Sequence, residues 1–403
     1  MRLLQIIPTY KPAYCYGGVI VSIGLLCEAL HGAGHEVLVA TTTANGKAEL
    51  PVHDRVPVPV NGVPVLYFPR WTKDHSQFSP GFLRWLWANA RRFDAVHIHS
   101  WWNLSALFGT MICLLRGVRP VLSPRGMLSS FTIKGKWKPA FHRLVGRRIL
   151  AKTFLHATSQ AELDECLGLI PGWPHGPVLP NILEIPVLND ERRMMNDESG
   201  AANSSFIIQN SSFKMLFLSR IHEKKGIDLL LAALPGLPFE WTLTIAGEGD
   251  QDYVEKLKKQ AENLGTGADG LPFSKKINWP GWVAPERRFG VFGQADLFVL
   301  PSHNENFANV VIESLAVGTP VLVSRHVGLS DYVLEKKLGW ACETTVESIR
   351  EQIIGAFLQK TERERIADAG PAQVRADFSA AVLAEKYVAV YLNASSSSKA
   401  NSK

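Results

Sequence analysis

Two glutamates, Glu305 and Glu313, stand eight positions apart in segment 301–320, which reads Pro-Ser-His-Asn-Glu-Asn-Phe-Ala-Asn-Val-Val-Ile-Glu-Ser-Leu-Ala-Val-Gly-Thr-Pro. A strand is predicted just before it, at 296–300. A helix beginning near Phe307 would place Glu313 roughly 9 Å along its axis, at about 1.5 Å per residue. Free N–H groups at the start of that helix would form an anion site. Hydrogen-bond acceptors at both ends could bind the sugar and ribose hydroxyls of a nucleotide-sugar, and the anion site between them could bind its pyrophosphate.

A structural explanation of both glutamates stays open at this point. Glu305 could stabilise the helix N-terminus electrostatically, and Glu313 could be a surface charge. The neighbours of Glu313 on the expected helix are, however, apolar nearly all round: Val310, Val311, Ile312, Leu315 and Ala316. A helix of that composition lies inside a protein, which disfavours a solvent-facing Glu313.

A second candidate is the loop 217–226, with the sequence Phe-Leu-Ser-Arg-Ile-His-Glu-Lys-Lys-Gly. A predicted strand ends near Ser219 and a helix begins after Gly226, so Arg220 and Lys225 flank a strand-to-helix loop. Phosphate groups bind at such loops in α/β folds. Arginine can hold phosphate oxygens with two N–H groups, and lysine adds a point charge. An ordinary solvated loop would explain the same residues.

Weaker candidates lie in the first half of the chain. Gly17 and Gly18 would let the backbone approach a ligand closely, although a flexible loop alone explains the pair. His97 and His99 lie near a predicted strand end, with His99 closer to the carboxyl end. A structural interpretation expects one of the two to be buried and the other exposed. Trp101 could stack on a sugar ring or pack in the core.

Neither a metal nor an organic cofactor is expected. Asp250-Gln-Asp252 has the spacing of a metal motif, but it precedes a predicted helix, and capping that helix explains it better. The five cysteines are scattered and form no Cys-x-x-Cys pair, which argues against a zinc ribbon or a disulfide framework. They are Cys15, Cys27, Cys113, Cys166 and Cys342.

The elements that would hold these residues alternate between strands and helices. Strands are predicted at 3–7, 36–40, 65–68, 95–99, 120–123, 153–158, 178–179, 214–219, 241–246, 297–301 and 320–324. Helices are predicted at 19–31, 104–116, 226–234, 253–264, 309–317 and 346–359. Near-continuous apolar strands alternating with helices predict an α/β protein with parallel sheets covered on both faces. The polar, aperiodic stretch 187–213 predicts a linker between two units with a cleft between them.

Charge is spread unevenly along the chain. The net charge is +6, but residues 1–180 hold 19 Lys and Arg against 9 Asp and Glu, and residues 101–152 hold ten basic residues and no acidic one. Such a surface could meet nucleic acid, an anionic membrane or an anionic substrate. The longest apolar run, 104–115, is too short to span a bilayer, and the N-terminus lacks a signal-peptide pattern. A cytoplasmic location is therefore expected.

Segments 217–226 and 301–320 together resemble the group 1 family of retaining glycosyltransferases, whose hallmark is Glu-x7-Glu before Gly-Thr-Pro with an upstream Arg…Lys-Gly loop. The likeness covers nearly the whole chain, in order. Further segments that resemble the family are 245–249, 280–283 and 295–302. Segments 17–18, 95–99, 123–128, 156–159 and 179–181 resemble a subset that builds bacterial surface polysaccharides.

The resemblance implies a GT-B fold, in which two Rossmann-like domains with parallel sheets face each other across a cleft. The acceptor-side domain would span 1–186 and the nucleotide-sugar domain 214–377, with a helix at 378–393 crossing back and a frayed tail at 394–403. Glu305 would meet the transferred sugar, Arg220 and Lys225 the donor pyrophosphate, and Glu313 the ribose. Other donor contacts are expected from Asn306, Phe307, Ala308, Asn309, Val283, Gly17 and Gly18.

The chain departs from the family pattern at several positions. Asn306 stands where glycine is usual, and asparagine tolerates left-handed dihedrals. Ala308 replaces a second common glycine and could narrow the sugar pocket. Asn181 is not followed by the usual glycine. Arg125 takes the place of a common histidine, so that a cation facing a phosphate is expected there, or a loop ion pair. The acceptor-side candidates are His99, Trp101 and Arg125.

The implied activity is metal-independent, retaining transfer of a hexose-like sugar from a nucleotide-diphosphate-sugar to a lipid-linked or polysaccharide acceptor, in bacterial surface glycan biosynthesis. A nucleotide-sugar epimerase or phosphorylase of the same fold, or a non-catalytic nucleotide-sugar-binding module, remains an alternative. Nucleic acid is not expected, because no recognition motif is present. The basic stretch 101–152 is expected to face anionic lipid headgroups or a lipid-diphosphate carrier, with the protein peripheral on the inner face of the membrane.

Overall fold

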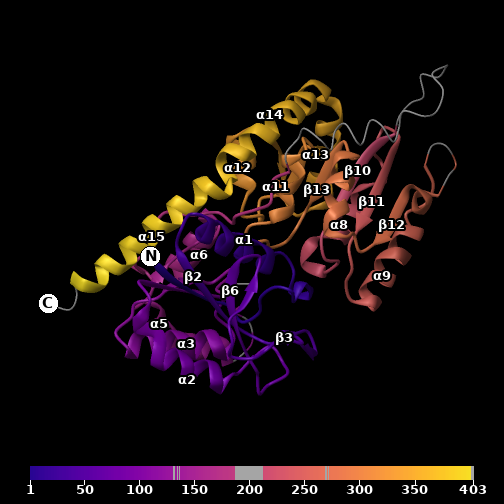
Figure 1. Ribbon diagram of the computed structural model, residues 1–403. Coiled ribbons are helices and arrows are strands. Elements are labelled where there is room, and N and C mark those ends of the chain that lie inside the picture. Colours follow the sequence, from indigo (N-terminus) through magenta and orange to yellow (C-terminus); the bar gives the residue numbers. More distant parts are fainter. Residues whose placement is uncertain are drawn as a thin grey trace. The chain divides into compact units, whose positions relative to one another are not determined.

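The computed structural model describes residues 1–129, 132, 133, 135, 137–186, 212–267, 270 and 272–400. The chain divides into two compact α/β units, one containing residues 1–183 and the C-terminal segment from residue 378, the other residues 184–377 (Figure 1). Most of the expected linker, residues 187–211, lies outside the described residues. Across the described ranges, every helix is too short or too polar to cross a lipid bilayer.

The first unit is built on a seven-stranded sheet in the order β5-β6-β2-β1-β7-β8-β9, parallel except for the β5–β6 pair. Leu3 and Leu4 on β1 belong to different hydrophobic clusters, because successive side chains of a strand point to opposite faces. The strands are β1 (Arg2–Ile6), β2 (Glu36–Thr42), β5 (Val58–Val60), β6 (Val63–Phe68), β7 (Ala95–His99), β8 (Val121–Ser123) and β9 (Phe154–Leu155). A separate antiparallel hairpin joins β3 (Ala44–Asn45) and β4 (Ala48–Glu49).

Helices cover both faces of this sheet. Residues of α1 (Gly18–Gly32) and α15 (Ala380–Ala400) share one cluster with Leu3, and residues of α2 (Pro80–Asn89) and α3 (Leu104–Leu115) share the other with Leu4. The remaining helical segments are α4 (Trp137–Phe141), the π-helical turn η3 (His142–Gly146), α5 (Arg147–Leu150), α6 (Gln160–Leu169), η1 (Tyr14–Tyr16) and η2 (Ala90–Arg92).

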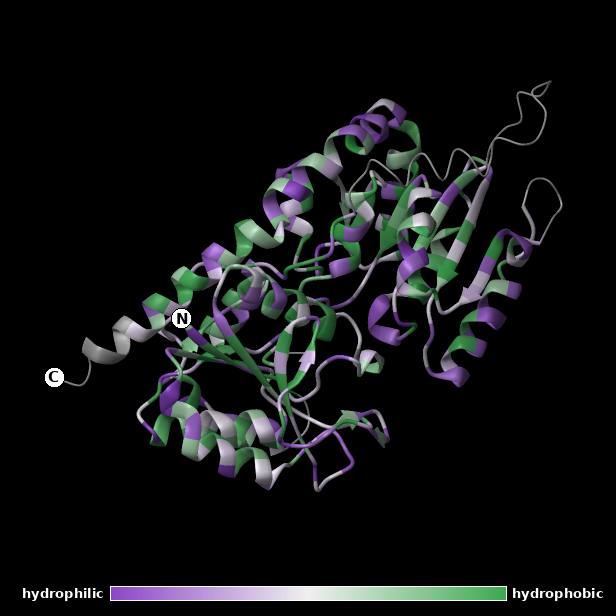
Figure 2. Cartoon of the chain, viewed as in Figure 1, coloured by the Kyte–Doolittle hydropathy of each residue, from purple (hydrophilic) through white to green (hydrophobic). Residues whose placement is uncertain are grey.

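The second unit holds a six-stranded, fully parallel sheet in the order β12-β11-β10-β13-β14-β15. Its strands are β10 (Phe213–Leu218), β11 (Trp241–Ala246), β12 (Ile277–Gly281), β13 (Leu297–Leu300), β14 (Val321–Ser324) and β15 (Gly339–Cys342). Its helices are α8 (Ile227–Ala233), α9 (Gln251–Glu262), α10 (Arg288–Gly293), α11 (Asn309–Ala316), α12 (Ser330–Glu335), α13 (Val346–Leu358) and α14 (Lys360–Phe378), with short turns η4 (Glu223–Lys225), η5 (Phe273–Lys276) and η6 (Pro285–Arg287). Hydrophobic residues are concentrated on the strands, whereas the residues of α9 are largely hydrophilic (Figure 2).

The order of the strands creates one reversal point in each sheet. In the second unit the chain runs from β10 outward to β12, and β13 then returns to the other side of β10. The first unit reverses in the same way between β1 and β7. In open α/β sheets a crevice for ligands forms outside the carboxyl ends of the strands at such a reversal.

The predicted elements differ from the observed ones at sheet edges, at chain ends and in several helices, since α2, α4, α5, α6, α10, α12 and α14 were not predicted. The strand expected at 153–158 shortens to β9, residues 178–179 form no strand, and β3, β4, β5, β12 and β15 were not predicted. The helix expected at 378–393 is α15, which continues through residues 394–400 of the expected tail. Alanine, at 394 and 400, has a high helix propensity, which accounts for part of that extension.

Candidate active site

Lys225 and Glu305 form an ion pair although 80 positions separate them in the sequence. Lys225 ends η4, in the loop after β10, and Glu305 lies in the loop after β13. These strands are neighbours, and the strand order reverses between them. Two of the predicted catalytic side chains therefore meet at the place in the sheet where ligands are expected.

A glycine allows the two loops to pack closely. Gly226 has a φ of 68°, and a Cβ on it would lie 2.2 Å from the carbonyl oxygen of Pro301. Only glycine fits such an approach without displacing the backbone. The N–H of His303 donates to the carbonyl of Lys224 over 2.8 Å, which ties the loop after β13 to the loop after β10. Lys225 is held against Glu305 by these backbone contacts.

Burial and the neighbouring charges shift the pKa values of Lys225 and Glu305 in opposite directions. Burial lowers the pKa of Lys225, and the charge of Glu305 partly restores it. Burial alone would raise the pKa of Glu305, but the positive charges of Lys225, Lys224 and Arg220 outweigh burial and hold its pKa below the ordinary value. Glu305 is consequently ionised at neutral pH and can accept hydrogen bonds from ligand hydroxyls. Arg220 is exposed in the same loop as Lys225.

The start of α11 contains a left-handed residue. Ala308 is the N-cap of α11 with a φ of 71°, whereas Asn306 is not among the residues with positive φ. The tolerance of Asn306 for left-handed dihedrals is therefore not used here, and Ala308, at the second position where glycine is usual, carries the positive φ. A left-handed residue with a Cβ costs roughly 1–2 kcal/mol. Phe307 and Ala308 are buried, and Asn309 begins the helix, so the backbone N–H groups that follow Glu305 line the helix N-terminus.

Glu313 is buried on α11, which excludes the surface-charge explanation. Arg288, the first residue of α10, places Nη1 at 3.6 Å from Oε1 of Glu313. Nη2 of Arg288 lies 3.2 Å from Oε2 of Glu184. Burial raises the pKa of Glu313, and Arg288 opposes that rise.

Two further residues singled out in the sequence, Val283 and Asp250, follow the strands on the β11–β12 side of the second sheet. Val283 follows β12, at the edge of the sheet, two strands from β10. Asp250 caps α9, where its carboxylate accepts from the N–H of Tyr253 at 3.2 Å. The capping explanation of the Asp250-Gln-Asp252 sequence is therefore confirmed. Within the described ranges, His, Cys, Asp and Glu side chains form no group of three or more arranged to hold a metal ion.

In the first unit, the predicted residues line the loops that follow β1, β7 and β8. Gly17 has a φ of 84° and open space where a Cβ would stand, and Gly18 begins α1. Arg125, after β8, has a φ of 56° and donates to Oδ1 of Asn181. Its Nη2 also lies 3.4 Å from Nδ1 of His99.

Three buried histidines share one directed chain of hydrogen bonds. Nε2 of His156 lies 3.0 Å from the carbonyl oxygen of Leu179, which can only accept, so Nε2 carries the proton. Nδ1 of His156 therefore accepts from the Ser123 hydroxyl, at 2.5 Å. Since that hydroxyl has one proton, Ser123 must accept from Nε2 of His97, at 2.8 Å.

The chain continues in the same direction to Arg125. The hydroxyl of Tyr391, on α15, donates to Nδ1 of His97 at 3.0 Å and accepts from Nε2 of Gln5 at 3.1 Å. Oε1 of Gln5 accepts from Nε2 of His99 at 2.9 Å, which leaves Nδ1 of His99 as an acceptor facing Arg125. Burial holds the pKa of His97 and of His99 well below the ordinary value, so both rings are neutral.

This arrangement corrects two expectations. His97 and His99 are both buried, so the interpretation of one buried and one exposed histidine is wrong. His99 is buried, and its Nδ1 faces the guanidinium of Arg125. Trp101 is 1% exposed and belongs to the core, which excludes a stacking role at the surface. Alternation along β7 puts both histidines on one buried face of the sheet.

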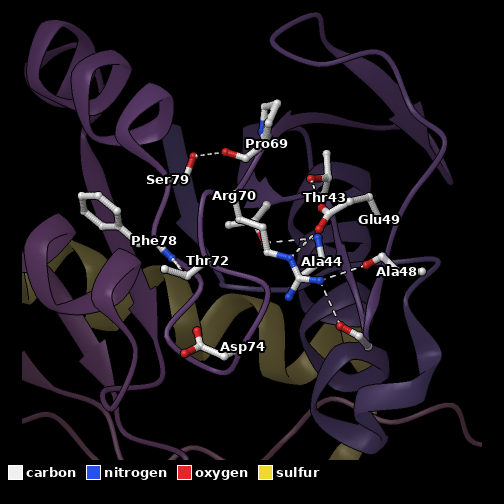
Figure 3. Close-up of polar contacts among 12 residues, drawn as sticks. Thr43, Ala44, Ala48, Glu49, Pro69, Arg70, Thr72, Asp74, Phe78 and Ser79 are labelled. Atoms are coloured by element: carbon white, nitrogen blue, oxygen red, sulfur yellow. Dashed lines mark hydrogen bonds and ion pairs between the residues drawn. The ribbon is translucent and has the colours of Figure 1, made fainter.

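Arg70 fixes the hairpin beside the Gly17 loop (Figure 3). Its Nε donates to Oε1 of Glu49 at 2.7 Å, and its Nη2 donates to the carbonyls of Gly46 at 2.9 Å and Ala48 at 3.0 Å. The thiol of Cys15, two residues before Gly17, lies 3.3 Å from the Asn45 side chain of that hairpin. The guanidinium thus orders a loop at the carboxyl edge of the first sheet.

Sequence reasoning missed Arg288, Arg70 and Tyr391. Arg288 follows another arginine in a polar turn, and no local pattern separates the two. Arg70 and Tyr391 act over 21 and 294 positions, on Glu49 and His97 respectively. The apolar run around Tyr391 predicts its burial but not its hydrogen-bond partner.

Two α/β units with largely parallel sheets have the architecture of the GT-B fold. The same fold is present in the crystal structure of Anabaena HepE in complex with UDP and glucose, with a TM-score of 0.71 and 18% identity, over 96% of this chain and 98% of that one. Residues 203–373 match the family model described as glycosyl transferases group 1, and residues 17–181 match the glycosyl transferase 4-like domain. The chain belongs to the group 1 glycosyltransferases.

Curated relatives of this family match along nearly the whole chain. An uncharacterized glycosyltransferase of Methanocaldococcus jannaschii is 25% identical over 97% of this chain and 98% of its own length. A glycogen synthase of Mycobacterium tuberculosis is 25% identical over 98% of this chain and 95% of its own length.

Proposed function

We propose that the enzyme transfers a sugar from a nucleotide-diphosphate-sugar to a lipid-linked or polysaccharide acceptor with retention of anomeric configuration, in bacterial surface glycan biosynthesis. The observation that carries the proposal is the Lys225–Glu305 pair at the carboxyl ends of β10 and β13. It combines an ionised acceptor for sugar hydroxyls with a buried cation beside it. HepE, which shares the fold, binds UDP and glucose, and this makes UDP-sugars the first donors to test.

On the donor side, the proposal gives each residue a separate task. Glu305 accepts hydrogen bonds from the hydroxyls of the transferred sugar, and Glu313 from those of the ribose. As the bond to the sugar breaks, negative charge grows on the departing diphosphate. Lys225, Arg220 and the N–H groups at the start of α11 lie in the loops that would meet this charge. Fixed positive groups can then replace a metal ion, so no metal or organic cofactor is included.

The acceptor side of the proposal rests on segment 137–150. Trp137, Leu144 and Val145 are exposed to 63%, 65% and 43%, and exposed arginines at 143, 147 and 148 accompany them. Apolar side chains among basic ones are typical of a surface that lies on anionic lipid. Binding to vesicles with and without anionic lipid tests this part, and equal binding would contradict it. Leu144→Glu should weaken binding to the anionic vesicles.

A donor screen followed by product analysis tests the proposed reaction. Thermal shift with UDP-, GDP- and ADP-sugars identifies the donor, and NMR of the product gives the anomeric configuration. The proposal predicts a glycosidic product with the configuration of the donor. An inverted product would exclude retention. Release of an epimerised nucleotide-sugar, or binding without turnover on any acceptor, would favour the epimerase or the non-catalytic module instead.

A further inference from the structure

Arg288 joins two carboxylates that lie in very different surroundings. The side chain of Glu313, on α11, is 10% exposed, and that of Glu184 is 65% exposed. Arg288 itself is 14% exposed and contacts each carboxylate with a different terminal nitrogen, over 3.6 Å and 3.2 Å. Arg288 therefore contacts Glu313 with one nitrogen, at Oε1, rather than in a bidentate arrangement. Oε2 of Glu313 takes no part in this contact.

A buried carboxylate needs a positive neighbour to stay ionised. The charged groups that act on Glu313 are Arg288, from α10, and Glu184, whose negative charge works in the opposite direction. The strand β14, which also packs on α11, has the sequence Val-Leu-Val-Ser and adds no charge. In the described part of the chain, Arg288 is thus the cation that offsets burial of Glu313.

We propose that Arg288 is a positioning residue for the donor nucleotide, which holds Glu313 as an oriented carboxylate so that its second oxygen accepts hydrogen bonds from the ribose hydroxyls. This inference rests on the proposed function, because it takes Glu313 as the ribose-binding residue. Arg288 does not touch the ligand in this account. It determines how well the site distinguishes a ribonucleotide from its 2′-deoxy form, since a protonated or turned Glu313 would lose an acceptor for the 2′-hydroxyl.

A purely structural role predicts something different. If Arg288 only fastened α10 to α11, its loss would weaken every ligand by a similar factor through loosened packing, at every pH. The positioning role predicts a larger loss for ligands with the 2′-hydroxyl than for their 2′-deoxy forms, which have one fewer hydroxyl to donate to Glu313. It also predicts a new pH dependence, because burial raises the pKa of Glu313 and Arg288 no longer counters it.

The test compares full-length wild type, Arg288→Gln, Arg288→Lys and the control Arg287→Gln. Arg287 is the adjacent, exposed arginine, so its replacement makes the same change of charge. UDP, GDP and ADP are titrated calorimetrically into wild type, and the tightest is carried forward with its 2′-deoxy form between about pH 7 and 9. Arg288→Gln should weaken the ribonucleotide about tenfold near pH 7, equivalent to about 1.4 kcal/mol, and weaken the deoxy form by about threefold or less.

Raising the pH should restore ribonucleotide binding to Arg288→Gln, with the deoxy form as the reference for phosphate ionisation. Arg288→Lys and Arg287→Gln should keep the wild-type preference, and Arg288→Lys supplies the comparison should Arg288→Gln fail to fold. Equal weakening of both nucleotides in Arg288→Gln, without pH dependence, would overturn the inference alone. A wild type that binds none of the three diphosphates would overturn the proposed function and this inference with it.

Discussion

The ammonium of Lys225 and the carboxylate of Glu305 are in direct contact at the carboxyl ends of adjacent strands β10 and β13. The contact exists because Gly226 lets one loop lie against Pro301 of the other. A buried ammonium and a partly buried carboxylate stabilise each other there. Removing either side chain should therefore change both the free energy of unfolding and the way that it depends on pH.

Lys225→Met should lower the free energy of unfolding by about 1–3 kcal/mol near neutral pH, because it leaves the partly buried carboxylate of Glu305 without its ion-pair partner. The wild-type pKa of Glu305 lies below its unfolded value of 4.5. Its stabilising contribution is thus present above pH 4.5 and disappears as the pH falls through the lower folded value. In the variant, burial raises the folded pKa of Glu305 toward or above the unfolded value, so acidification should remove less stability than in wild type and the difference between the two proteins should narrow as the pH falls. Urea unfolding at a series of pH values measures this, and parallel curves would contradict it.

Heteronuclear NMR should show His97, His99 and His156 as neutral rings protonated at Nε2. Burial lowers the pKa of His156 to about 3, from an unfolded value of 6.5. Between those values the unfolded chain binds more protons, so this part of the stability is complete above pH 6.5 and falls with acidification. A ring protonated at Nδ1 would disprove the directed chain. Tyr391→Phe, which removes the donor to His97, should cost about 1–3 kcal/mol.

Arg70→Ala should destabilise the first unit by about 3 kcal/mol. The substitution removes the buried partner of Glu49 and leaves the carbonyls of Gly46 and Ala48 without their donor. Arg2→Ala serves as the control, because Arg2 makes an exposed pair at 3.8 Å with Asp94 and should cost under about 1 kcal/mol. Thermal unfolding distinguishes the two, and a similar small effect for both would argue against an ordering role of Arg70.

Sugar transfer should persist in EDTA, since Lys225, Arg220 and the start of α11 supply the positive groups at the diphosphate in the proposed mechanism. Asp250→Asn should leave turnover unchanged, because Asp250 caps α9 and asparagine is also a good cap. Initial rates with chelator, and after addition of Mg²⁺ or Mn²⁺, give the answer. A strict requirement for a divalent ion would contradict the proposal of metal-independent transfer.

Local sequence was sufficient for the features that depend on neighbours in the chain. The apolar runs predicted the parallel strands, and the apolar surroundings of Glu313 predicted its burial. The order of strands, which brings the loops of Lys225 and Glu305 together, required the family resemblance, because strand pairing depends on contacts far apart in sequence. The same limit hid Arg288, whose partners are 104 positions before it and 25 after it. The positive φ of Ala308 was not predicted, because left-handed dihedrals were considered only for Asn306 and the backbone path of this loop cannot be read from residue preference.

The most direct test of the account is to compare turnover and nucleotide binding in Glu305→Gln. The substitution keeps size and hydrogen-bonding capacity but removes the charge next to Lys225. If Glu305 meets the transferred sugar, kcat should fall by about 100-fold or more, whereas Kd for the nucleoside diphosphate, measured by calorimetry, should change by about threefold or less. Unchanged turnover would contradict the central role given to the Lys225–Glu305 pair.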